Sequence, residues 1–295
     1  MSEQMDDSQP INAAMSALET LGWQVSAGAA GWQLQRESHT IYADVNARWL
    51  YFSLPVPQTQ PAAHYLQASR QLYLCKYARD PQGQLLLQAE LPLVELERDY
   101  IHTTVEALWR AAQRHDAPLT SAPSAPAAEQ NVEYFPRYAL DVYFKGLQHE
   151  GWGLRKPISA NEYHLHYKAP ERPFEVYLAF NAAWAYWQVP ILEGAAAAAW
   201  WRSAQRDRLC QYLLTVNEQL YWARFVVDEQ SNVLLLLDMP LSLCTLERFR
   251  LSAQAIAQYA SDYAYEVLIM AELDRDEALA RLVSANLNER LEFHN

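Results

Sequence analysis

The apolar positions in the first part of the chain change several times between the spacing of a helix and the spacing of a strand. Helices are expected where apolar side chains recur every three or four residues, and strands where they alternate between turn residues. The expected helices are 11–22, 62–72 and 96–114. The expected strands are 23–27, 31–37, 73–79 and 84–91, with a hairpin across 39–56. In the last helix, the side chains expected to face the core are Ile101, Val105, Leu108 and Ala112.

The second half of the chain repeats this pattern. Residues 39–56 read HTIYADVNARWLYFSLPV and residues 174–191 read FEVYLAFNAAWAYWQVPI, which places Trp49 opposite Trp184. Further matches are Gln71-Leu72-Tyr73 with Gln219-Leu220-Tyr221, 85–93 with 233–241, and Leu96-Glu97-Arg98 with Leu246-Glu247-Arg248. Self-similarity over so long a period indicates two copies of one structural unit.

The segment between the two copies has the composition of a tether. Residues 117–130 read APLTSAPSAPAAEQ, a stretch of Pro, Ala and Ser that cannot bury a core of its own. The expected units are a first repeat at 1–115, a linker at 116–132, a second repeat at 133–271 and a C-terminal helical extension at 272–295. We expect a monomer with an internal pseudo-twofold axis, and a homodimer remains an alternative.

Composition narrows the classes of partner. With 35 acidic and 23 basic residues, the chain has a net charge of −12, which opposes non-specific binding to nucleic acid or to an anionic membrane. The first residues, MSEQMDDSQP, lack the basic and apolar regions of a signal peptide, and no run of about 18 apolar residues could span a bilayer. The three cysteines have no C-x-x-C spacing. We therefore expect a cytoplasmic protein.

Two segments of the second repeat carry a resemblance to a known family. They read TVNEQLYWARFVVDEQSNVLLLLDMPL and LERFRLSAQAIAQYASDY, and the first repeat has the similar RQLYLCKYARDPQGQLLLQAELPL. These stretches resemble the YbjN family, whose domains share the fold of class I type III secretion chaperones. The resemblance implies an α+β fold of two repeats, each a curved antiparallel sheet with helices packed on it, arranged as an intramolecular pseudo-dimer. It also implies a non-enzymatic, chaperone-like or regulatory role in which the protein binds a protein or peptide partner.

Aromatic residues mark the strand that is most similar between the repeats. Trp184 and Tyr186 face one side of this strand and Trp187 the other, and Trp49, Tyr51 and Phe52 repeat the arrangement. Helices on one side of a sheet bury only one of these two sets. Since Trp and Tyr are common interface anchors, we expect these six residues at the contact between the repeats or at a groove for a partner. The alternative is that helices cover both sets.

Residues that could carry chemistry are few. The sequence contains no G-x-S-x-G, H-E-x-x-H, G-x-G-x-x-G or P-loop motif, so we expect no catalytic residue, no cofactor and no metal. Cys75 lies among apolar residues and is expected to be a structural thiol, and Asn217, where a helix meets a strand, is expected to bind backbone groups.

One enzymatic alternative remains open. Glu162, His164 and His166 alternate along a strand and would share one face, as the ligands of a metal would. The protein would then be a metal- or small-molecule-binding enzyme. The matching strand of the first repeat carries Gln33, Gln35 and Glu37, so two of the three candidate ligands are absent there.

Overall fold

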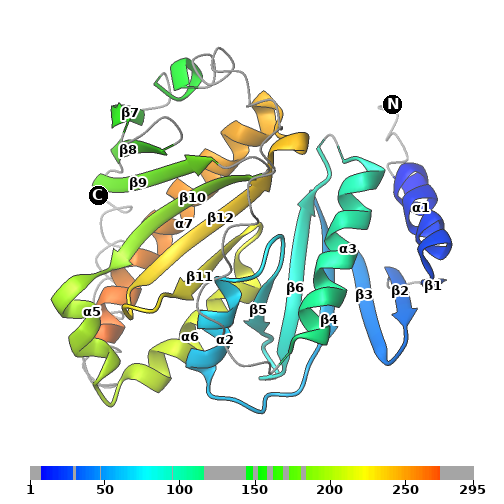
Figure 1. The fold of residues 1–295 in the computed structure, drawn as a ribbon, viewed down its shortest axis with the longest axis horizontal. Coiled ribbons are helices and arrows are strands. Elements are labelled where there is room, and N and C mark those ends of the chain that lie inside the picture. Colours follow the sequence, from blue (N-terminus) through cyan, green and yellow to red (C-terminus); the bar gives the residue numbers. More distant parts are fainter. Residues whose placement is uncertain are drawn as a thin grey trace, which may run out of the picture.

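Two six-stranded antiparallel sheets, one in each half of the chain, form the frame of the molecule (Figure 1). The computed structural model describes residues 8–28, 31–46, 48–94, 96–115, 144–148, 152–157, 162–168, 173–180 and 184–272. The expected linker, and the expected extension beyond residue 272, lie outside the described residues.

The first sheet has the strand order β1-β2-β3-β4-β6-β5. Its strands are β1 (Gln24–Gly28), β2 (Gly31–Arg36), β3 (His39–Asn46), β4 (Trp49–Pro55), β5 (Lys76–Arg79) and β6 (Leu85–Pro92). The helices of this half are α1 (Ser8–Ala17), the short 3-10 helix η1 (Leu18–Leu21), α2 (Ala62–Ser69) and α3 (Arg98–Gln113). The order of elements is the one predicted from the spacing of apolar residues.

The second sheet has the order β11-β12-β10-β9-β8-β7, which is the same arrangement. Its strands are β7 (Trp152–Pro157), β8 (Glu162–Lys168), β9 (Pro173–Phe180), β10 (Trp184–Leu192), β11 (Ala223–Val227) and β12 (Val233–Pro240). The helices are α5 (Gly194–Trp201), α6 (Arg206–Gln219), the 3-10 helix η2 (Leu241–Leu243) and α7 (Leu246–Glu272). The fold class is therefore α+β with two similar repeats, as predicted.

A long helix packs on one face of each sheet, α3 on the first and α7 on the second (Figure 1). All four side chains expected to face inward from α3 are buried, and Val105 and Leu108 are completely so. On the sheet side, Phe52 of β4 is completely buried, and Trp187 packs against Phe249 of α7 with ring centroids 5.0 Å apart. Each repeat thus has the sheet-and-helix core that its apolar pattern predicts.

The expected strand over 73–79 is shorter in the structure, because β5 begins at Lys76. The expected helix over 62–72 likewise ends at Ser69. Residues 70–75 form a loop instead, with Leu74 in the left-handed region at φ 60°. The start of this loop is hydrogen-bonded to the end of α2, and the N–H of Leu74 and the carbonyl of Leu72 bind the second repeat, a contact that local sequence spacing could not show.

The edge strands β5 and β11 face each other at the centre of the molecule (Figure 1). Helix α6 of the second repeat packs against β5, and α2 of the first repeat packs against β11. Each middle helix therefore covers the edge strand of the other repeat. This exchange explains why β11 is buried along its whole length, and β5 at every residue but its last.

Candidate functional site

The six aromatic residues singled out in the sequence divide into two groups. Phe52 and Trp187 are completely buried in the two sheet-and-helix cores, so they have no surface to offer a partner. The other four are half-buried on the opposite face of their strands: Trp49, Tyr51, Trp184 and Tyr186. Burial, together with nearby carboxylates led by Glu90, raises the pKa of Tyr51, so its phenol stays protonated.

Both tryptophans reach across the boundary between the repeats. The ring of Trp49 stacks on Tyr221 with centroids 5.2 Å apart and an interplanar angle of 22°. The ring of Trp184 lies 5.0 Å from Tyr73 at an angle of 33°. Tyr73 and Tyr221 are equivalent residues in the sequence repeat, so the two contacts are related by the pseudo-twofold axis.

Two buried ion pairs lie beside these aromatic contacts. The Lys76 ammonium is 3.0 Å from a carboxylate oxygen of Glu90, and both side chains are 3% exposed. In the second repeat the equivalent pair is Arg224 with Asp238, whose side chains are 6% and 3% exposed. Burial lowers the pKa of Lys76, and Glu90 opposes that shift.

Each ion pair also binds the backbone of the other repeat. Lys76 donates to the carbonyl oxygens of Leu220 and Ala223, the latter at 3.1 Å. Arg224 donates in the same way to the carbonyl oxygens of Ser69 at 3.0 Å and Leu72 at 2.7 Å. The two cations thereby make hydrogen bonds beyond their ion pairs, which is the condition for burying a charged group.

The carboxylates of the two ion pairs also make equivalent hydrogen bonds with the opposite repeat. Asp238 accepts the N–H of Leu74 at 3.0 Å, and Glu90 accepts the N–H of Trp222 at 3.0 Å. Both donor residues are in the left-handed region, at φ 60° and φ 68°. Large side chains rarely adopt this conformation. Its presence at equivalent positions shows that both loops are held in shape by the opposite repeat.

Asn217 binds backbone groups, as predicted. Its side-chain amide accepts the N–H of Phe225 at 2.6 Å and donates to the carbonyl oxygens of Phe225 and Tyr77. The equivalent Ser69 accepts the N–H of Tyr77 at 3.0 Å. The bond to Tyr77 crosses between the repeats, so Asn217 adds a further link to the interface.

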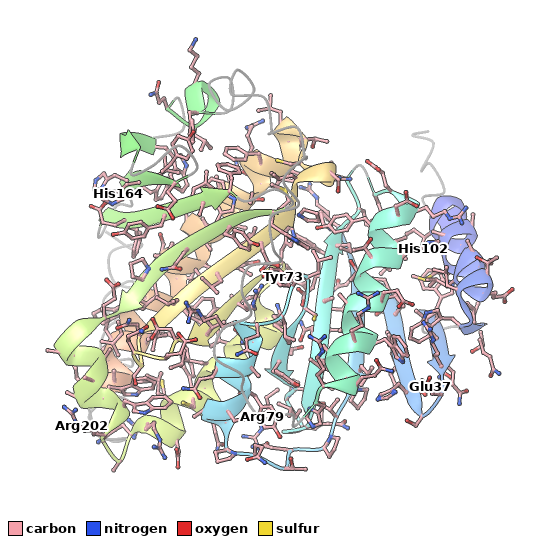
Figure 2. All side chains as sticks on the ribbon, viewed as in Figure 1. Glu37, Tyr73, Arg79, His102, His164 and Arg202 are labelled. Carbon is pink, nitrogen blue, oxygen red and sulfur yellow. The ribbon has the colours of Figure 1, made fainter. Side chains whose placement is uncertain are left out.

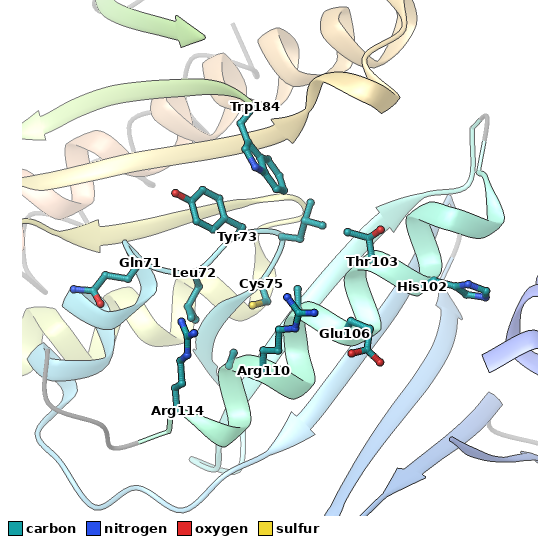
Figure 3. Close-up of a pocket in the computed structure, with 13 residues that line it drawn as sticks. Gln71, Leu72, Tyr73, Cys75, His102, Thr103, Glu106, Arg110, Arg114 and Trp184 are labelled. Carbon is teal, nitrogen blue, oxygen red and sulfur yellow. The ribbon is translucent and has the colours of Figure 1, made fainter. Parts of the chain in front are cut away.

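A groove of about 520 Å³ opens next to this interface (Figure 3). One wall is α3, and the other is the loop 71–75 with Trp184 from the second repeat at one end. Both repeats therefore contribute to one cavity. The described lining residues are Gln71, Leu72, Tyr73, Leu74, Cys75, His102, Thr103, Glu106, Ala107, Arg110, Ala111, Arg114 and Trp184.

The equivalent place in the second repeat is bridged by side chains of α7. The phenol oxygen of Tyr259 accepts the N–H of Tyr221 at 3.0 Å, and Tyr263 donates to the side chain of Gln219 at 3.3 Å. The residues of α3 that correspond to these tyrosines are Trp109 and Gln113. Trp109 instead lies beneath Arg36, whose guanidinium carbon is 3.8 Å from the ring centroid. The pseudo-symmetry is therefore broken at the groove.

Of the three candidate metal ligands of the second sheet, the two histidines contact a carboxylate on the neighbouring strand β9. His164, labelled in Figure 2, lies 2.5 Å from Glu175, and His166 lies 3.2 Å from the same carboxylate. The ring of His164 also stacks on Tyr177. No group of three His, Cys, Asp or Glu side chains in the described part of the chain is placed to hold a metal ion.

Cys75 lies on the groove but is 3% exposed, and burial raises its pKa to about 12. The pKa values of Cys210 and Cys244 are also raised to about 12, chiefly by burial. A thiol with so high a pKa is not a nucleophile at neutral pH. The structure thus agrees with a structural role for Cys75.

Sequence reasoning named Trp184 but missed the rest of the groove. Tyr73 was visible as part of the repeated Gln-Leu-Tyr triplet, which was the one available signal for a contact there. Arg110 and Arg114 carried no signal, because exposed arginines one turn apart are ordinary on a helix. The groove depends on the way the second repeat docks, which local spacing does not encode.

Comparisons with known proteins assign the chain to no family. No protein-family model matches the chain, and no curated protein is similar to it. Among solved structures, one similar chain belongs to the ExoT–SpcS complex from Pseudomonas aeruginosa. It is 22% identical, with a TM-score of 0.30, over 36% of this chain and 97% of that chain. Among the described helices, none has the length and apolar character needed to cross a bilayer.

Proposed function

We propose that this protein is a non-catalytic, cytoplasmic binding protein that holds a segment of another protein in the groove between its repeats. The role would be that of a chaperone or a regulatory adaptor. The observation that carries this proposal is the groove itself, since one repeat supplies the helical wall and the other supplies Trp184. The resemblance of the repeats to the YbjN family supports the same class of function.

The groove has the lining that a peptide side chain requires. Leu72, Leu74 and Ala111 provide apolar surface, and the rings of Tyr73 and Trp184 close one end. Aromatic residues of this kind are frequent among the residues that dominate protein interfaces. A volume of about 520 Å³ is within the range of known ligand pockets, so one or two side chains of a partner would fit.

A blocking substitution on α3 tests the proposal. Thr103 is exposed and lines the groove, so Thr103→Trp should fill the cavity without removing any buried side chain. Gln113→Trp is the matched control, because Gln113 is exposed on the same helix and does not line the groove. The two variants and the unmodified protein are used as baits in the native lysate, and the captured chains are quantified by mass spectrometry.

We expect at least one protein that binds the unmodified chain and Gln113→Trp but is lost from Thr103→Trp. Its binding should then be reproduced with purified components. If all three baits capture the same proteins in equal amounts, the groove is not the binding site and the proposal is wrong.

A further inference from the structure

The groove carries a positive charge that contrasts with the acidic chain around it. Arg110 and Arg114 lie one turn apart on α3, are exposed, and line the groove (Figure 3). Neither forms an ion pair with any residue that the structure describes. Arg110 and Arg114 thus form a local positive charge at one cavity of a chain whose net charge is −12.

The one carboxylate among the described lining residues does not neutralise these arginines. Glu106 lies 2.6 Å from Arg36 and also accepts the indole N–H of Trp23 at 3.2 Å. His102, at the other end of the wall, makes its hydrogen bond with the backbone carbonyl of Ala14 at 3.2 Å. Among the described lining residues, the charge that is left without an ion pair is therefore that of the two guanidinium groups.

The second repeat shows that these arginines are not required by the fold. Alignment of Leu96-Glu97-Arg98 with Leu246-Glu247-Arg248 places Ala260 and Ala264 opposite Arg110 and Arg114. Both alanines are buried, with exposures of 0% and 5%, in the half where the tyrosines of α7 bridge the equivalent place. The arginines thus occur only where the groove is open.

Resting on the proposed function, we propose that the groove takes an acidic segment of its protein partner. An apolar side chain of the segment lies against Tyr73 and Trp184, and carboxylates of the segment bind Arg110 and Arg114. Guanidinium groups bind carboxylates through paired N–H donors, which gives direction as well as attraction. At physiological salt, charges more than about 8 Å apart are largely screened, so these two arginines outweigh the net negative charge of the protein.

Selection of random peptides displayed on phage tests this inference on the full-length chain. Peptides that bind the unmodified protein are selected and sequenced, then measured by fluorescence polarisation against three variants. These are the blocking variant Thr103→Trp, the double variant Arg110→Gln/Arg114→Gln, and the charge-matched control Arg98→Gln/Arg202→Gln. Arg98 and Arg202 are exposed and do not line the groove.

We expect the selected peptides to combine Asp or Glu with an aromatic or aliphatic residue. Their binding should weaken about tenfold or more in the Arg110→Gln/Arg114→Gln variant, decline with added salt, and change less than about twofold in the control. Peptides that Thr103→Trp blocks but that are neutral or basic, or that bind the double variant normally, would overturn the acidic preference and leave the groove function intact. If no selected peptide is blocked by Thr103→Trp, the proposed function itself fails, and this inference with it.

A second copy of the chain is the competing occupant, since the protein is itself acidic. Sedimentation velocity over a range of protein concentrations distinguishes this case. Monomeric behaviour of the unmodified protein at every concentration supports a foreign segment. Concentration-dependent dimers that disappear in the Arg110→Gln/Arg114→Gln variant would overturn the proposal and assign the groove to self-association.

Discussion

At the scale of single residues, the molecule depends on ion pairs that water does not reach. Lys76 and Glu90 are each 3% exposed, and their hydrogen bonds extend to the backbone of the opposite repeat. A buried pair of this kind contributes little compared with an apolar pair of the same shape, but removing one partner leaves an uncompensated charge. The pair is therefore more important for fixing how the repeats dock than for stability as such.

The substitution Lys76→Met should lower the free energy of unfolding by about 3–5 kcal/mol, because it leaves Glu90 buried without its cation. The matched control is Arg70→Met, which removes a partly exposed cation that pairs with Glu229 across the same boundary. The Arg70→Met substitution should lower the free energy of unfolding by no more than about 1 kcal/mol. Urea unfolding followed by circular dichroism measures both. Equal losses in the two variants would contradict the importance given to the buried pair.

The cysteines provide a second test at this scale. Cys75 and Cys210 are buried with pKa values raised to about 12, so neither should react with iodoacetamide in the folded protein at neutral pH. Cys244 is less buried and should be modified first. Mass spectrometry of the labelled protein gives the order. Rapid labelling of Cys75 would mean that the floor of the groove opens to solvent, contrary to the structure.

At the scale of elements, the sequence predicted the order of helices and strands but not the conformation of the connecting loops. Periodicity identified α3 with its buried face and the strand pair around Trp49, because both are set by local spacing. The loop 70–75 was predicted partly as helix and partly as strand. Its real conformation is imposed by Arg224 and Asp238 from the other half of the chain. A contact so distant in sequence leaves no periodic signal.

Helix α7 has a role that its partner α3 lacks, since its tyrosines bind the last residue of α6, Gln219, and the loop residue Tyr221. Tyr259→Phe should lower the free energy of unfolding by about 1 kcal/mol, because the N–H of Tyr221 loses its acceptor. Tyr265→Phe on the same helix is the control, since Tyr265 is 55% exposed. Thermal unfolding compares the two. A stability loss confined to Tyr265→Phe would show that the assigned hydrogen bond is not formed.

At the scale of the whole molecule, the two repeats form one body with an approximate twofold axis. Lys76 and Arg224 are equivalent residues of the two repeats, as are Glu90 and Asp238, and Tyr73 and Tyr221. The two members of each pair make equivalent contacts with the opposite repeat, as the duplication in the sequence predicts. The six aromatic residues pointed to this boundary, although Phe52 and Trp187 belong to the cores. The open groove could not be predicted. It is found where α3 has Trp109 and Gln113 in place of the tyrosines Tyr259 and Tyr263 that bridge the equivalent place in the second repeat, and these residues belong to no motif.

The same contacts determine whether the binding groove exists, since Trp184 and α3 come from different repeats. If the repeats separated, the groove would lose one end and the loop 71–75 would lose the partners of its backbone. Binding and docking of the repeats are therefore expected to be linked. A bound segment should stabilise the whole molecule against unfolding, because it binds only the docked form.

Differential scanning calorimetry of the full chain and of Lys76→Met tests most directly whether the repeats are one cooperative unit. The account predicts one unfolding transition in the unmodified protein, which the substitution moves to lower temperature as a whole. Two separate transitions, with only the one belonging to the first repeat moved by Lys76→Met, would contradict the shared core and the groove built on it.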